Sequence, residues 1–477
     1  MKYSPKNLNE HINKNNSYQF ISSTIDKDEI SESRKIVAGP WVFKNFYEYE
    51  NSTNSQEFYS IPNNFSSFQD CKNDHDYIKK LIEIYSLHLK DFLNKFHKTN
   101  HSQRYWDILI LPWLTTYIPC QLIRWRIIEK SLTENKKLLF SEITIDEDLN
   151  PCTTEDYLEL VRDNHKFNYL IFKNMFFFFK YKRKKNIVFI KSTLRPKKYI
   201  KKNFYFKKSK IFYYKLIEKI NNIIARKNLI YIDNNSFKKK IFIQLNLKLN
   251  QLPIFLFNKT FQYLLSSGVK FNHNLRKDIN FVFKEDFKKK DFFVEFLDEI
   301  IKFDVPKSFL EGYKIFNNSI NHLSFNPKII ISSYHYNNER LKFWIAKKVN
   351  VDKSTFFQLQ HGANNQQRFS ACHEIDAKTA DQRLVWSQPR ERNDIQMPSS
   401  KFMNLKKLNN KGLCLTYVQK PIFTFPKRIN TDENYFINIK NIILLKKNLD
   451  QSHFKNLIYA PSGSNYDVER KEVVKIL

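Results

Sequence analysis

The chain has 477 residues, of which 42% are hydrophobic and 27% charged, and it carries a formal net charge of +32. This length is too great for one ordinary core and predicts two or three domains, while the apolar content excludes an intrinsically disordered chain. The five cysteines are scattered and form no CxxC pair, which argues against a zinc site and a disulfide framework.

The N-terminus and the apolar runs bear on localisation. Residues 1–16 contain no hydrophobic stretch of the kind found in a secretory signal. The most apolar run, Tyr169 to Phe179, contains Lys173 and is too short for a membrane span. We therefore expect a cytoplasmic protein, with peripheral association with the inner membrane left open.

The N-terminal part of the chain mixes polar and strongly apolar segments. Residues 1–34 form a polar leader without periodicity, and residues 35–38 predict a strand that ends at Gly39-Pro40-Trp41. Residues 74–98 have the apolar spacing of a helix. The run 105–114, which contains Trp113, is compatible with a strand stopped by Pro112 or with the start of a helix. A helix over 119–131 follows.

Residues 164–215 contain no acidic side chain, and their lysines and arginines alternate with phenylalanine and tyrosine. Such a groove would suit single-stranded nucleic acid. The lysines come in doublets, however, and no RRM, KH or zinc-finger pattern accompanies them. We favour a solvated basic face, suited at most to anionic lipid or a polyanionic substrate, and expect no specific nucleic acid partner.

The remaining elements alternate between strands and helices. This order is typical of an α/β protein with an open parallel sheet. We expect one Rossmann-like sheet domain over residues 35–400, with a helical insertion at about 130–325. Strands are predicted at 186–190, 228–232, 327–333, 356–360 and 383–387, and helices at 211–226, 254–267, 292–302, 307–321 and 338–348.

A break at 388–411, rich in Pro, Ser and Asn, separates this domain from a second Rossmann-like one. Residues 411–477 supply strands near 412–418 and 457–461, a helix at 433–448 and the start of another helix. Two strands do not make a core of their own, so we expect this second domain to be incomplete.

The strand 356–360 ends in the most informative residues of the chain, Gln360-His361-Gly362. A polar group that follows a buried strand of an α/β sheet lies at the edge where ligands bind. His361 has a side chain that titrates near neutral pH, and Gly362 permits close approach of the backbone to a ligand. His361 is therefore the leading candidate for a catalytic residue, although a histidine before a glycine is also common in ordinary turns.

The motifs in their order resemble a family of bacterial transferases from surface-carbohydrate gene clusters (lipopolysaccharide O-antigen and capsule). The resemblance covers most of residues 35–125 and 325–470. The motifs that carry it are Ala38-Gly39-Pro40-Trp41, Tyr105-Trp106-Asp107-Ile108-Leu109, Leu111-Pro112-Trp113-Leu114, Leu359-Gln360-His361-Gly362 and Leu384-Val385-Trp386.

The resemblance implies a two-domain GT-B glycosyltransferase whose C-terminal, donor-side domain is truncated in this chain. Its partners would be a nucleotide-activated sugar and a glycan acceptor, and it would need no cofactor and no metal. His361 would be catalytic. The implied substrate-binding residues are Gln360, Gly362, Asn364, Arg368 and Glu374, together with Gly39, Trp41 and Trp113 beside the acceptor.

Two other interpretations stay open. The truncation is compatible with a folded but inactive remnant of a transferase. The net charge of +32 is compatible with a nucleic-acid- or membrane-surface-binding protein without enzymatic activity. A general bias toward Lys, Asn, Ile and Phe explains the charge without either partner, and we favour that explanation.

Overall fold

A computed structural model describes the chain in segments. These are residues 17–26, 34–43, 48, 50–52, 58–60, 68–132, 137–192, 208–255, 257, 259–277, 279, 291–321, 323, 325–333, 335–360, 371–399, 416–418, 437–449 and 458–460.

The first sheet has five parallel strands in the order β3-β2-β1-β4-β5. The order reverses at β1, whose neighbours are β2 on one side and β4 on the other. Phe20, Ile36 and Phe140 of these central strands are fully buried. The strands span Ser17–Ile21 (β1), Arg34–Val37 (β2), Phe58–Ser60 (β3), Lys137–Glu142 (β4) and Ile187–Lys191 (β5).

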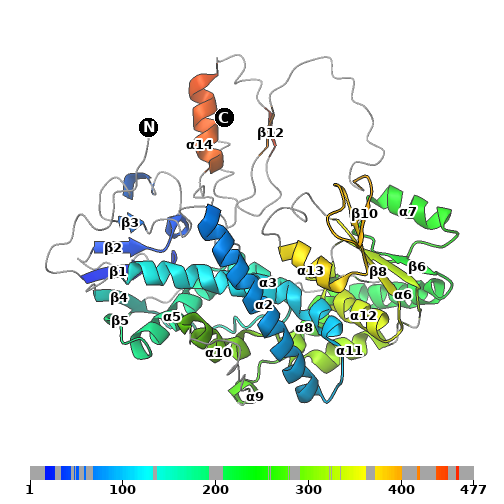
Figure 1. Ribbon diagram of the computed structural model, residues 1–477, viewed down its shortest axis with the longest axis horizontal. Helices are drawn as coiled ribbons and strands as arrows, with labels where there is room; N and C mark the ends of the chain where they lie inside the picture. Colours follow the sequence, from blue (N-terminus) through cyan, green and yellow to red (C-terminus); the bar gives the residue numbers. More distant parts are fainter. Residues whose placement is uncertain are drawn as a thin grey trace.

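The second sheet also has five parallel strands, in the order β10-β9-β8-β7-β6. The strand that precedes Gln360, β8, is its centre, and the short strand β6 is one of its edges. In Figure 1 the two sheets lie at opposite ends of the main body. The strands span Ile230–Ile232 (β6), Ile329–Ser332 (β7), Thr355–Leu359 (β8), Gln382–Val385 (β9) and Asp394–Gln396 (β10).

Two long helices, α2 (Phe68–His97) and α3 (Gln103–Ser131), run between the sheets (Figure 1). From Tyr105 to Ile128 only Thr116 and Arg126 are not fully buried. A helix that is apolar on every side is stable only inside a core. Helix α3 meets that condition by packing against α4 (Thr154–Asp163) and α5 (His165–Tyr181) on one side and α12 (Glu339–Asn350) and α13 (Ala371–Thr379) on the other.

The remaining elements complete the helical shell around the two sheets. They are α6 (Lys208–Ala225), α7 (Lys239–Lys248), α8 (Lys259–Ser267), α9 (His273–Lys277), α10 (Phe292–Asp304) and α11 (Tyr313–Asn321), with short 3-10 turns η2 (Pro40–Val42), η3 (Lys307–Phe309) and η4 (His335–Asn337). None of the described helices combines the length and hydropathy needed to cross a bilayer.

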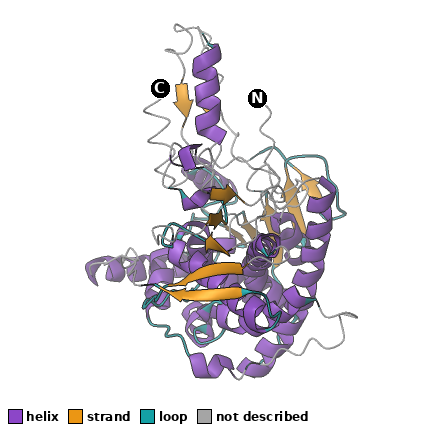
Figure 2. Cartoon of the chain, turned by 90° about the vertical axis from the view of Figure 1, so that its left-hand side faces the viewer, coloured by secondary structure: helices purple, strands orange, loops and turns teal. Residues whose placement is uncertain are grey.

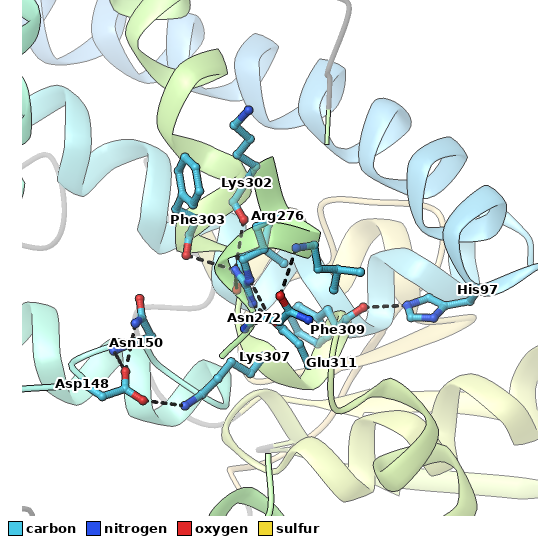
Figure 3. Close-up of polar contacts among 12 residues, drawn as sticks. His97, Asp148, Asn150, Asn272, Arg276, Lys302, Phe303, Lys307, Phe309 and Glu311 are labelled. Atoms are coloured by element: carbon cyan, nitrogen blue, oxygen red, sulfur yellow. Dashed lines mark hydrogen bonds and ion pairs between the residues drawn. The ribbon is translucent and has the colours of Figure 1, made fainter. Parts of the chain in front are cut away.

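A buried arginine ties several of these helices together (Figure 3). The Arg276 guanidinium donates hydrogen bonds of 2.7–3.0 Å to the carbonyl oxygens of Lys302, Phe303 and Val305. In this way it caps the C-terminus of α10. It also forms a bidentate ion pair with Glu311, at 2.8 and 2.7 Å. A positive group at a helix C-terminus stabilises the helix because it hydrogen-bonds the unpaired carbonyls and interacts favourably with the negative end of the helix dipole.

Beyond residue 399 the structure describes two strands and one helix. Strands β11 (Thr416–Val418) and β12 (Ile458–Ala460) pair in parallel, and α14 (Ile437–Asn448) lies between them in the sequence. Figures 1 and 2 both show these elements projecting from one side of the main body. The predicted strands and the helix at 433–448 are therefore confirmed, while the helix predicted to start after residue 466 lies outside the described residues.

The prediction of one sheet over residues 35–400 with a helical insertion at 130–325 was wrong in its topology. Strands β4, β5 and β6 lie within the supposed insertion, and the strands form two sheets. The leader at 1–34 contains β1, which sits at the centre of the first sheet. A short strand with polar Ser17 and Gln19 gives little periodic signal, so the pattern alone did not identify it. The predicted domain boundaries themselves stay a prediction.

Candidate functional site

At their carboxyl ends, three strands of the second sheet are followed by a polar residue and a fourth by a tryptophan. Asp233 follows β6, Ser333 follows β7, Gln360 follows β8 and Trp386 follows β9. Because the strands are parallel, these residues come together at one edge of the sheet, the edge where open α/β sheets bind ligands. We call it the β8 edge.

Gln360 is fixed in place at the β8 edge. Its backbone N–H donates to Leu384 O at 2.9 Å, which extends the pairing of β8 with β9. Its side-chain Oε1 accepts a 2.6 Å hydrogen bond from the backbone N–H of Trp386. The Gln360 side chain is buried, and its amide oxygen is used inside the protein. It therefore defines where the chain leaves β8, one residue before His361.

The other predicted substrate and catalytic residues of this segment cannot be placed. His361, Gly362, Asn364 and Arg368 lie outside the described residues. The backbone of Glu374 lies on α13, but its side chain is outside the description. The roles predicted for these residues stay predictions.

A network of hydrogen bonds links β8 to helix α13. Gln358 Nε2 donates to the Tyr336 hydroxyl at 3.1 Å, and that hydroxyl donates to Asp376 Oδ1 on α13. All three side chains are buried. This network of hydrogen bonds holds α13, which carries Glu374, against the β8 edge.

His335, a buried histidine that the sequence did not single out, lies next to this hydrogen-bond network. Its ring packs against Tyr336 and Phe356, with centroid distances of 4.4 and 5.2 Å. Burial, reinforced by the positive charge of Lys342, lowers the pKa of His335 to about 3, against a smaller opposing effect of Gln358. The imidazole is therefore neutral at physiological pH.

Several polar atoms around His335 have no well-formed hydrogen bond within the described part of the chain. They are both His335 ring nitrogens, Ser333 Oγ and Gln358 Oε1. The His335 ring and the Gln358 side chain make only a weak polar contact, which is the source of the small opposing effect on the His335 pKa. Buried polar atoms are nearly always paired, because an unpaired one costs roughly 1–3 kcal/mol. These atoms lie near the ends of β7 and β8, where they can form hydrogen bonds with water or with a bound molecule.

A buried carboxylate closes the same edge on the β6 side. Asp233 Oδ2 accepts from Ser332 Oγ at 3.1 Å, and Ser333 N–H donates to Ser236 Oγ at 3.0 Å. Burial raises the pKa of Asp233 above its ordinary value. The sequence offered no motif for Asp233 or His335, since each is a single polar residue after a strand.

The N-terminus of α12 carries a buried ion pair between Glu339 and Lys342. Glu339 Oε1 accepts from Thr154 N–H and Ser308 Oγ at 3.0 and 2.9 Å, and Lys342 Nζ donates to Thr154 Oγ1 at 2.7 Å. Thr154 begins α4, which packs on α3, α5 and η4, so this ion pair links α12 to α4. Lys342 in turn contributes to keeping His335 neutral.

The first sheet has a polar edge of its own, at the point where its strand order reverses. Asp26 is fully buried and accepts from Ser22 N–H, Ser22 Oγ and Ser23 N–H at 2.7–2.9 Å. Burial raises the pKa of Asp26 to about 6, against the lowering effect of these hydrogen bonds. This turn lay inside the supposed leader and was missed.

Gly39 and Trp41 lie beside that turn, directly after β2. The Trp41 indole N–H donates to Ser22 O at 3.0 Å. A Cβ at position 39 would come within 2.2 Å of the Trp41 ring, so the indole occupies the space that only glycine leaves. The two residues are thus placed at a strand end, as predicted, while their predicted role in acceptor binding stays a prediction.

Of the two alternatives for the run 105–114, a strand or the start of a helix, the structure shows the helix, so Trp113 does not follow a strand. It lies within α3, because Pro112 and Pro119 are accommodated inside that helix. Its ring is 0% exposed and stacks on Tyr117 at a centroid distance of 4.8 Å. A side chain in that position has no surface with which to line a cleft. Among the described residues no group of three His, Cys, Asp or Glu side chains is arranged to hold a metal ion.

Comparison with known proteins gives a family. The model of the LIC12162 family transferase matches residues 19–476, nearly the whole chain, including the middle region that the recognised motifs left out. No curated protein and no solved structure matches. The chain belongs to the LIC12162 transferase family.

Proposed function

We propose that this member of the LIC12162 transferase family transfers a sugar from a nucleotide-activated donor to a glycan hydroxyl, in the synthesis of bacterial surface polysaccharide. The observation that carries the proposal is the β8 edge. There Gln360 fixes the exit of the chain toward His361 at the centre of a parallel sheet. The polar surroundings of His335, Ser333 and Asp233 complete that edge.

In the proposed reaction, the acceptor hydroxyl oxygen forms a bond to the anomeric carbon of the sugar. The bond from that carbon to the donor phosphate breaks, and the nucleotide leaves with its electrons. His361 takes the proton of the hydroxyl as general base, a role that suits an imidazole with a pKa near neutrality. Arg368 and Asn364 bind the phosphate and the sugar hydroxyls, and Glu374 orients the histidine or the acceptor.

The two five-stranded parallel sheets support a GT-B type of architecture, in which each sheet supplies one substrate site at its carboxyl edge. We assign the β8 edge to the reacting groups and the edge with Gly39 and Trp41 to the acceptor. Trp113, which is buried in α3, is not part of this assignment.

The test is a donor screen with the full purified chain. The chain is incubated with UDP-, GDP-, dTDP- and CMP-activated sugars, each with and without a bacterial glycan extract as acceptor. Mass spectrometry then measures the released nucleotide and the mass of the glycan. We expect acceptor-dependent nucleotide release with one class of donor and a matching gain of one sugar mass. Release of no nucleotide from any donor, or release without glycan extension, would contradict the proposal.

A further inference from the structure

The outer side of the second sheet, around the edge strand β6, exposes an unusual number of large apolar side chains. Eight of the eighteen exposed large hydrophobic residues in the described part of the chain lie between residues 216 and 255. Ile223 is 57% exposed and Leu229 is 59% exposed. Single exposed apolar residues are ordinary, whereas a concentrated group marks an interaction surface.

These side chains come from neighbouring elements. Leu216, Ile220 and Ile223 recur on α6 with the spacing of one helix face. The segment after α7 returns along α6 and β6, since Asn221 Nδ2 donates to Phe255 O at 3.4 Å and Asn228 Nδ2 to Leu252 O at 2.9 Å. Exposed Leu252 and Phe255 are thus brought next to α6. In Figure 1, α6, β6 and α7 lie together at the right-hand end of the molecule.

The charges of the same segment all have one sign at the surface. Exposed Lys219, Lys227 and Lys248 stand among the apolar residues, and Lys238, Lys239 and Lys240 open α7. Residues 216–255 contain two acids, Glu218 and Asp233. Both are buried: Glu218 pairs with Arg340, and Asp233 accepts from Ser332. The outward face is therefore apolar and cationic, with its acids turned inward.

We propose that this face, which we call the α6–β6 surface, docks the protein onto an anionic lipid bilayer. Apolar side chains flanked by lysines are the combination that binds the headgroup region, where the apolar groups enter the interface and the lysines contact lipid phosphates. Nucleic acid would be attracted by the lysines as well, but it would gain little from aliphatic Ile and Leu side chains, because bases stack on aromatic rings. The surface lies outside the β8 edge. Membrane binding by this surface can therefore be tested independently of the proposed sugar transfer.

The experiment is vesicle co-sedimentation of the full chain. One set of vesicles contains phosphatidylglycerol and phosphatidylcholine, and the other contains phosphatidylcholine alone. The variants are Ile220→Ser with Ile223→Ser, and Lys219→Gln with Lys227→Gln and Lys248→Gln. Matched controls remove exposed residues elsewhere: Leu87→Ser with Val351→Ser, and Lys137→Gln with Lys270→Gln and Lys314→Gln. The two lysine triples lower the net charge equally.

We expect the wild type to bind the anionic vesicles and not the neutral ones. The lysine variant should lose about a hundredfold in binding, roughly fivefold for each lysine removed. The apolar variant should lose at least about tenfold, in line with the loss of two partly buried aliphatic groups. Both control variants should bind within about twofold to fivefold of the wild type. Thermal melts that match the wild type establish that these surface changes leave the fold intact.

Three results would overturn the proposal. The first is a wild type that does not bind anionic vesicles, and the second is equal loss of binding in the control variants. The third is binding to duplex DNA that falls in the lysine variant but not in the apolar one, with no preference for anionic vesicles. That last outcome would assign the surface to nucleic acid.

Discussion

His335 is a neutral imidazole held in the interior beside the β8 edge. It has no well-formed hydrogen bond among the described residues, and Lys342 adds a positive charge nearby. A protonated ring there would place a second cation in a medium of low dielectric constant, which disfavours the charged form. Its burial includes a contact with the ring of Phe356, which lies on β8.

A change of His335→Gln tests this directly through the pH dependence of stability. The folded-state pKa of about 3 lies below the ordinary value of 6.5, so between these values only the unfolded chain binds a proton at this position. The free energy of unfolding of the wild type should therefore fall as the pH drops below 6.5, by up to about 1.4 kcal/mol per pH unit from this group. Denaturant titrations between pH 7.5 and 5 should show a shallower fall for the variant. Equal slopes in the two proteins would show that His335 is exposed or paired.

Gln360 offers a second test at the scale of one side chain. In Gln360→Ala the backbone N–H of Trp386 loses its acceptor, which should cost roughly 1–3 kcal/mol in the free energy of unfolding. Gln360→Glu keeps an oxygen in that position and serves as the control. If the alanine variant is as stable as the wild type, the bond to Trp386 does not hold the end of β8.

The site was only partly predictable from the sequence. Gly362 after a buried strand made Gln360 and His361 visible, because strand ends in α/β sheets have a recognisable pattern. Asp233 and His335 had no such pattern, since their place at the same edge depends on which strands pair.

At the scale of elements, apolar composition predicted the strands that are themselves apolar, whether they stand in the middle or at the edge of a sheet. Strands β7 and β8 have continuous apolar runs and were found at nearly the observed bounds. Strands β1 and β4 begin with polar residues and were missed. The apolar run at 105–114 left strand and helix open, because a helix buried on all sides has no polar face to reveal its period.

The pair Glu339–Lys342 links helix α12 to the N-terminus of α4. A Glu339→Gln change leaves Lys342 buried without its counter-ion, which should cost about 3–5 kcal/mol. Replacing both residues, Glu339→Gln with Lys342→Met, removes the charge together with its partner and should recover at least half of that loss. Urea denaturation curves of the two variants give the comparison. A single variant within about 1 kcal/mol of the wild type would mean that water reaches this pair.

For the whole molecule, two parallel sheets share one buried helix, α3, and each ends in a polar edge. The sequence predicted an α/β protein with parallel strands, but it could not divide the strands between two sheets. The division depends on β4 pairing with β1, a contact between segments more than a hundred residues apart, and on β5 pairing with β4. The match to the transferase family covers residues 19–476 and so includes strands of both sheets.

The most direct test of the central claim compares His361→Ala with the wild type in acceptor-dependent sugar transfer, using the donor that the screen identifies. We expect kcat to fall about 10²–10⁴-fold, the usual contribution of a general base, and the free energy of unfolding to change by no more than the roughly 0.5–3 kcal/mol of ordinary point variants. An unchanged kcat in a variant that binds the donor normally would contradict the role of His361 as general base. The β8 edge would then not be the place where the reaction occurs.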